Sequence, residues 1–107
     1  MVILANAFSL NMLSSSEALI SVREVGLQEV KRLISGGFTS AIGHQGTADI
    51  LTMLLDVDVP FNRVAVKVGS GDKLIVFQLL TRLEEGKVLS PEELKNLPYK
   101  FFLVEIL

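Results

Sequence analysis

Cysteine is absent from the 107-residue chain, and so is tryptophan. Without cysteine the protein has no disulfide, no thiolate nucleophile and no zinc–thiolate site, and such a sequence suits a reducing compartment. Histidine is almost absent too, since His44 is the only one. One histidine cannot build a histidine-rich metal site, and the acidic pair at residues 56–58 is too short for a calcium loop. We therefore expect neither a metal nor a cofactor.

Long hydrophobic runs are also missing. The apolar opening over residues 2–5 is interrupted at Asn6, and no basic residue comes before it. This pattern is neither that of a signal peptide nor that of a membrane-spanning helix. We therefore expect a cytoplasmic protein with no membrane partner.

Neither sign of charge dominates. Ten basic and twelve acidic residues are mixed along the chain, which gives a net charge of −2. A protein that binds long nucleic acid usually carries a basic stripe that displaces counterions, and none is visible here. Duplex DNA is thus disfavoured as a partner. A compact ligand that contains phosphate stays open, because a few well-placed cations are enough to hold it.

Hydrophobic residues are plentiful, at 50% of the chain, which is enough for the core of one domain over residues 1–107. Short apolar runs and alternation predict strands, while spacings of three and four predict helices. The expected strands span 2–5, 18–24, 38–42, 63–68, 74–80 and 101–106. The expected helical segments are 9–13, 26–35, one capped by Thr47, and one starting at 90–93. Such a mixture defines the α/β or α+β class, a mixed sheet with helices packed against it.

Two predicted strands flank the turn at residues 69–72. In the first, Val64, Val66 and Val68 alternate with more polar neighbours, so one face is expected in the core. The second is apolar on both faces, which predicts a central strand covered on both sides. Gln78 is its polar exception. A polar residue there is expected to find a hydrogen-bond partner or to belong to a site.

His44 lies in the loop Gly43-His44-Gln45-Gly46, just before a predicted helix. One interpretation is a surface histidine in a loop. The other is a general acid or base, because glycines let a ligand approach the backbone and a helix N-terminus attracts anions. The loop pattern is compatible with both.

Further polar residues raise the same question. The charge run Arg82 to Lys87 is either a solvated loop or an arginine clamp for phosphate, held by a nearby carboxylate. Asn6, Ser9 and Asn11 are each typical turn or cap residues. Together with Gln78 they form a polar set at strand ends, where sites in sheet proteins tend to lie.

Four motifs occur in order along the chain: Leu4-Ala5-Asn6-Ala7-Phe8-Ser9-Leu10-Asn11-Met12-Leu13, Ala41-Ile42-Gly43-His44, Asn62-Arg63-Val64, and Arg82-Leu83-Glu84-Glu85-Gly86-Lys87-Val88-Leu89. With these motifs the chain resembles, nearly end to end, the viral anti-CRISPR ring nucleases. Those are small proteins of archaeal viruses and bacteriophages with cellular relatives.

The resemblance implies metal-independent cleavage of cyclic tetra-adenylate, the second messenger of type III CRISPR complexes, by a homodimer that binds the ring at its subunit interface. It makes His44 the general acid, with Arg82 and Glu85 supporting the reacting phosphate. The residues that it implies for the ligand site are Asn6, Ser9, Asn11, Arg63 and Gln78. Two departures from the family pattern stand at Gln45-Gly46, where Asp-Ser is frequent, and at Thr81, where Gln is common.

Two alternatives come from other functional classes. A module that sequesters the messenger without cutting it has no need of His44. A small viral transcription regulator is disfavoured by the lack of a basic recognition helix.

Overall fold

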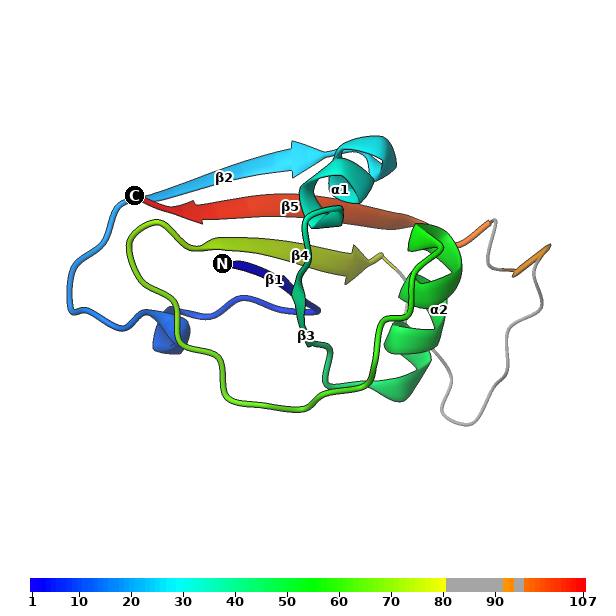
Figure 1. The fold of residues 1–107 in the computed structure, drawn as a ribbon, viewed down its shortest axis with the longest axis horizontal. Coiled ribbons are helices and arrows are strands. Elements are labelled where there is room, and N and C mark those ends of the chain that lie inside the picture. Colours follow the sequence, from blue (N-terminus) through cyan, green and yellow to red (C-terminus); the bar gives the residue numbers. More distant parts are fainter. Residues whose placement is uncertain (81–91, 94–95) are drawn as a thin grey trace.

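In a computed structural model, residues 1–80, 92–93 and 96–107 are described, and they form one five-stranded sheet with two α-helices (Figure 1). The elements in chain order are β1 (Val2–Ala5), the 3₁₀ helix η1 (Leu10–Met12), β2 (Ile20–Val25), α1 (Leu27–Ile34), β3 (Thr39–Ala41), α2 (Gln45–Leu55), β4 (Lys73–Leu79) and β5 (Tyr99–Ile106). This arrangement confirms the predicted class and defines it as α+β. No helix among the described residues has the length and apolarity to cross a bilayer.

The strands are ordered β2-β5-β4-β1-β3. β1 runs parallel to both of its neighbours, β3 and β4, while β5 runs antiparallel to β4 and β2. β4 is therefore central, as predicted. Because β4, β1 and β3 are parallel neighbours, their carboxyl ends meet at the same edge of the sheet, and this edge carries the candidate site.

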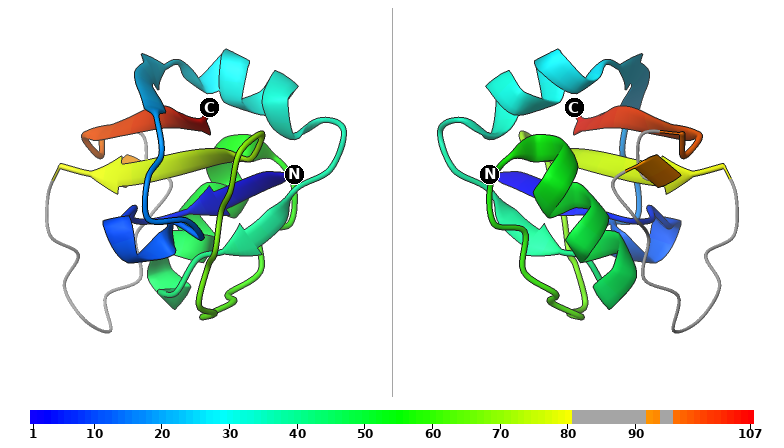
Figure 2. Two further views of the ribbon diagram at one scale, coloured as in Figure 1. Left: turned by 90° about the vertical axis from the view of Figure 1, so that its left-hand side faces the viewer. Right: turned by 90° about the vertical axis from the view of Figure 1, so that its right-hand side faces the viewer.

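Both helices pack on one face of the sheet. α1 lies over the β2 side and α2 over the β1 and β3 side (Figure 2). The core between helices and sheet includes the rings of Phe77, Tyr99 and Phe101, with centroids 5.1–5.5 Å apart. Burial of each large apolar side chain stabilises the fold by about 1.5–3 kcal/mol. The other buried members are Leu4, Val25, Val30, Ile34, Ile42, Ala48, Ile50, Leu51, Leu55, Val59, Ile75 and Leu103.

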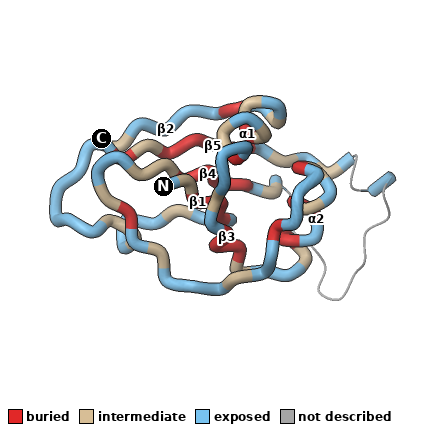
Figure 3. The backbone as a smooth tube through the Cα atoms, in the orientation of Figure 1, coloured by how far each residue is buried: buried red, intermediate tan, exposed pale blue. Residues whose placement is uncertain are grey.

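The opposite face has no α-helix among the described residues and is covered in part by η1 and irregular chain. Part of the segment 8–13 and residues 66–68 pack on it, over an apolar cluster from β1, β4 and β5. Buried positions accordingly concentrate on these three strands (Figure 3). The cover is incomplete. Leu74 at the start of β4 is fully buried, whereas Gln78 near its end is exposed. The prediction that β4 is covered on both sides is right for its first half only.

The predicted strand over 63–68 is wrong. Val64 is 51% exposed, and only Val68 at the end of the segment is fully buried. The chain pairs at two isolated points, Phe61 with Ile42 and Val68 with Leu13, and has no regular structure between them. Alternating valines favour an extended chain, but a strand also requires a continuous row of hydrogen-bond partners. This segment passes from one pairing point to the other and has no such row.

The predicted cap of α2 is also displaced. The helix starts at Gln45, so its N-cap is His44 and not Thr47, which is buried in the first turn. The helix start predicted over residues 90–93 lies largely outside the described residues.

Candidate functional site at the ends of the parallel strands

Three residues predicted for the site follow or end neighbouring parallel strands. Asn6 comes directly after β1, and the Gly43–His44 turn follows β3 after Ile42. Gln78 is the second-last residue of β4, whose Val76 is paired with Ala5 of β1. The sheet thus brings to one edge polar residues that are up to 72 positions apart in the sequence, 78 − 6. This is the edge at which ligands bind in parallel α/β sheets.

His44 is fixed by the helix that it starts. Its backbone is extended, with φ −140° and ψ 123°, and its Nδ1 accepts a hydrogen bond of 3.4 Å from the Thr47 amide. Its carbonyl accepts the first helical hydrogen bond, from Ala48, at 3.0 Å. Because Nδ1 is the acceptor, the neutral ring carries its proton on Nε2. The side chain is exposed, so that nitrogen is available to a ligand.

Asn6 holds the turn that carries His44. Its Oδ1 accepts a hydrogen bond of 3.2 Å from the Gly43 amide. An amide N–H can only donate, so the oxygen of Asn6 must face Gly43 and its Nδ2 group is left to donate elsewhere. Asn6 therefore offers two hydrogens to a ligand while it fixes the histidine turn.

Arg63 lies against the same turn. A Cβ built on Gly43 would stand 3.4 Å from Cγ of Arg63, so the aliphatic stem of the arginine packs directly on this glycine. The guanidinium belongs to an exposed residue. Asn6, Arg63 and His44 thus surround Gly43, and each presents nitrogen donors. Such a group suits an anion, because arginine and imidazole both bind phosphate oxygens through charge-assisted hydrogen bonds.

Gln78 borders a hollow of about 400 Å³ on the face of the sheet opposite α1 and α2. The hollow is mostly apolar and is lined by Asn6, Ala7, Phe8, Val22, Val76, Gln78, Phe102 and Val104. Gln78 is exposed, and no hydrogen bond joins its side chain to another described residue. Of the two predicted alternatives for Gln78, a structural hydrogen bond is not found among the described residues, and a place in the candidate site stays a prediction. Asn6 connects this hollow to the histidine turn.

The structure does not gather every predicted residue. Ser9 and Asn11 flank or belong to η1, which lies toward the end of the sheet where β4 starts (Figure 1). There the Asn11 carbonyl accepts a 2.6 Å hydrogen bond from Nζ of Lys67, and the Ser9 side chain makes no cap hydrogen bond. Arg82 and Glu85 lie outside the described residues. No three acidic or histidine side chains of the described ranges come together as metal ligands.

One contributor to the site carries no role in the sequence-based prediction. Asn62 belongs to the Asn62-Arg63-Val64 motif, and its side chain donates to the carbonyl of Ser40, the middle residue of β3. Its only signal in the sequence is its place next to Arg63. That position does not reveal the hydrogen-bond partner of Asn62, because Ser40 is 22 residues away in the sequence.

The fold and this edge define a class: a small α+β protein with a cluster of nitrogen donors at the ends of three parallel strands. The model of the STIV B116-like family matches residues 2–101, so the chain belongs to that family. B116 of Sulfolobus turreted icosahedral virus has a similar structure, with a TM-score of 0.85, 34% identity and coverage of 97% of both chains.

Relatives at the sequence level come from viruses and from a bacterium. Protein 26 of Sulfolobus islandicus filamentous virus is 39% identical over 99% of this chain and 92% of its own length. ORF117 of Acidianus two-tailed virus is 36% identical over 82% of this chain and 79% of its own. YddF of Bacillus subtilis is 30% identical over 92% of this chain and 94% of its own. The family is thus largely viral among these relatives, and a viral origin for the chain is supported.

Proposed function

We propose that this protein is a metal-independent ring nuclease, which cleaves cyclic tetra-adenylate to linear di-adenylates and thereby switches off type III CRISPR signalling. In a virus this activity is an anti-CRISPR defence. In a cell it resets the signal. The proposal rests on the four motifs that resemble viral ring nucleases and on the chemistry of the His44 edge.

The observation that carries the proposal is the convergence of donors around Gly43. Among the residues that the structure describes, neither Nε2 of His44 nor Nδ2 of Asn6 has a hydrogen-bond partner, and the Arg63 stem lies 3.4 Å from the Cβ position of the glycine. A phosphodiester needs this combination: a donor for its leaving oxygen and fixed hydrogen bonds for its other oxygens. Asn6 and Arg63 reach this turn from distant parts of the chain, so His44 has two further donor residues beside it.

The reaction uses a nucleophile that RNA itself contains. The ribose 2′-hydroxyl attacks the adjacent phosphorus, a P–O2′ bond forms, and the P–O5′ bond opposite to it breaks. His44 gives the proton on Nε2 to the departing 5′-oxygen, while the proton of the 2′-hydroxyl leaves to solvent. The step requires the protonated imidazole, because a neutral ring that gave up its Nε2 proton would become an imidazolate, and a protonated Nδ1 no longer accepts from Thr47. The first products end in a 2′,3′-cyclic phosphate.

A homodimer fits the symmetry of the substrate. A two-fold assembly presents the same site twice, and two cuts at opposite phosphates of a four-membered ring give two di-adenylates. The hollow lined by Asn6 and Gln78 lies on the sheet face opposite α1 and α2, which the described residues cover only in part. We assign the subunit contact to this face.

The deciding experiment is incubation of the protein with cyclic tetra-adenylate in excess EDTA, followed by chromatography of the products. We expect linear di-adenylates, initially with 2′,3′-cyclic phosphate ends, at a rate that EDTA does not change. A ring that is bound but never cut would make the protein a messenger-sequestering module. Tight, salt-dependent binding to duplex DNA with no effect on the ring would instead support a transcription regulator.

A further inference from the structure

The segment 60–63 is attached to β3 mainly through two side chains. The hydroxyl of Ser40, which is 6% exposed, donates to the Pro60 carbonyl at 2.7 Å. The side chain of Asn62 donates through Nδ2 to the Ser40 carbonyl at 2.7 Å. One backbone bond of 2.8 Å, from the Asn62 amide to the Ile42 carbonyl, completes the attachment. These bonds take the place of the ladder that a strand would have.

The attachment ends one residue before Arg63. After Asn62 the chain has no regular structure up to the isolated pair at Val68. The stem of Arg63 nevertheless lies on Gly43, so its place depends on what holds its neighbour. An arginine side chain loses conformational entropy when it binds a ligand. If the arginine is already held in place before binding, less entropy is lost for each hydrogen bond that the guanidinium forms.

We propose that Asn62 is a positioning residue that holds Arg63 against the Gly43–His44 turn, with Ser40 as its buried anchor. The consequence of this role rests on the proposed function: a correctly placed Arg63 binds a phosphate that is within reach of His44. Asn6, which follows β1, fixes the turn that carries His44, and Asn62, which is bonded to β3, fixes Arg63. The distance between the two donor side chains, His44 and Arg63, is therefore kept constant. Asn62 itself touches no substrate in this arrangement.

The first test uses the protein without nucleotide. In Asn62→Ala, NMR spectra should show changed amide shifts at Gly43 and Arg63, and ¹⁵N relaxation should show greater motion of Arg63. Asn62→Asp keeps the shape of the side chain but loses the Nδ2 donor, and it should give the same result. Gln28→Ala, at an exposed position of α1, is the control. An Arg63 amide that stays as ordered as in the wild type in both Asn62 variants overturns the proposal.

The second test is a double-mutant cycle in affinity for cyclic tetra-adenylate, measured in a His44→Asn background so that the ring stays intact. We expect Asn62→Ala to weaken binding by about tenfold, the equivalent of one good hydrogen bond to a charged group. In an Arg63→Ala protein it should have no further effect, because the residue acts through Arg63. Equal thermal melting of all variants shows that the fold is kept.

The outcomes separate the two hypotheses. Losses that add in the double variant overturn the positioning role even if the ring is bound and cleaved. If the wild type binds no cyclic tetra-adenylate, the proposed function fails, and the nucleotide-free NMR comparison still decides whether Asn62 positions Arg63.

Discussion

His44 and Asp56 stand at the two ends of α2, and both hold backbone positions that other residues usually fill. N-caps are commonly Ser, Thr, Asp or Asn, and the left-handed C-terminal position is commonly Gly. His44 accepts from the Thr47 amide, and Asp56 has φ 55° and ψ 36°. A residue that fits its backbone role poorly is expected where the side chain serves another purpose. His44 has such a purpose in the proposed reaction.

The role of His44 as the N-cap of α2 and its proposed role as general acid can be separated by substitution. His44→Asn keeps an N-cap acceptor and removes the titrating ring, whereas His44→Ala removes both. We expect both variants to lose roughly 10²–10⁴ in turnover of cyclic tetra-adenylate while affinity is largely kept. Only His44→Ala should also melt earlier, because a lost cap costs about 1 kcal/mol. Full turnover in His44→Asn would show that the histidine is a cap alone.

Asp56 is the only non-glycine residue with positive φ in the described ranges. Its negative charge also lies at the C-terminal end of α2, where the helix dipole is unfavourable to it. We expect Asp56→Gly to raise the free energy of unfolding by about 0.5–1 kcal/mol, and the melting temperature by roughly 2–6 °C. Asp58→Gly is the matched control, because φ is not positive there. Calorimetry should show no rise for Asp58→Gly, and equal rises in both variants would contradict the argument.

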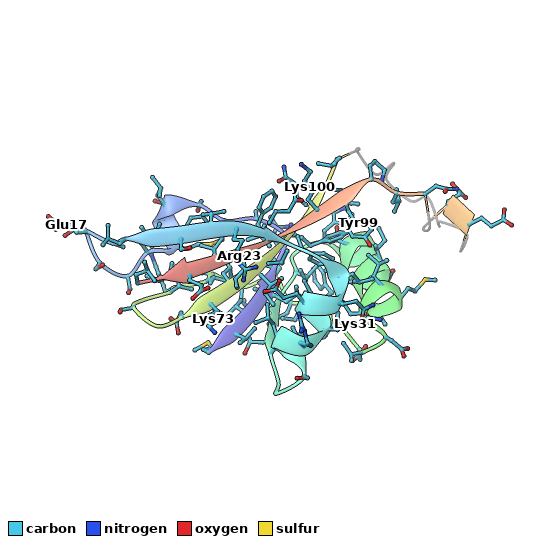
Figure 4. The ribbon with its side chains drawn as sticks, turned by 90° about the horizontal axis from the view of Figure 1, so that it is seen from above. Glu17, Arg23, Lys31, Lys73, Tyr99 and Lys100 are labelled. Carbon is cyan, nitrogen blue, oxygen red and sulfur yellow. The ribbon has the colours of Figure 1, made fainter. Side chains whose placement is uncertain are left out.

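At the level of elements, a surface ion pair links β2 to α1. Arg23 on β2 lies beside α1 (Figure 4) and binds both carboxylate oxygens of Glu29, at 2.8 and 3.1 Å. Hydrogen bonding to Arg23 lowers the pKa of the Glu29 carboxyl from its ordinary value of 4.5. The unfolded chain, with the ordinary pKa, takes up its proton at a higher pH than the folded chain. The contribution of the pair to stability is therefore fully present above pH 4.5 and is lost as the pH falls through the lowered pKa.

Glu29→Gln tests this linkage. At pH 7 the variant should melt at a lower temperature than the wild type, and the difference should disappear as the pH falls through the lowered pKa of Glu29. Glu17→Gln, which removes an exposed carboxylate that has no ion pair with any described residue, is the control. A difference that stays constant from pH 7 to pH 2 would mean that Glu29 acts through packing and not through its charge.

The elements were predictable where one local pattern decides them. Apolar runs and periodicity predict β1, α1, β4 and β5, because each buries a face that its own side chains define. The alternation in β2 predicts the strand but not its burial, since only Val25 of that strand is buried. The same alternation fails at Val64, since it describes an extended chain and says nothing of a pairing partner. The residues of the candidate site also fall into those that the sequence indicates and those that it does not. The motifs indicate His44, Asn6 and Arg63, but the role of Asn62 depends on a carbonyl at Ser40 that only the folded chain brings near.

At the scale of the whole molecule, the two faces of the sheet differ. Both helices cover one face, and irregular chain covers part of the other, leaving Val22 60% exposed beside Phe102 and the hollow. Exposed apolar side chains gathered at a hollow are typical of an interaction surface. Under the proposed function, which involves a cyclic substrate with repeated sites, the expected occupant is a second copy of the same chain.

Val22→Lys tests this assignment, because a two-fold contact brings the two introduced charges into one interface. We expect the wild type to have twice the 11.7 kDa chain mass by light scattering, and Val22→Lys to have the mass of a single chain. The control is Met53→Lys, since Met53 is similarly exposed, at 55%, but lies on α2 and therefore on the helix-covered side.

The Val22→Lys monomer should keep its melting temperature, as surface substitutions usually change stability by about 0.5 kcal/mol or less. It should lose cleavage of cyclic tetra-adenylate, because the ring requires both sites. A dimeric Val22→Lys protein would place the subunit contact elsewhere, and a monomeric wild type, with and without the ring, would contradict the homodimer itself.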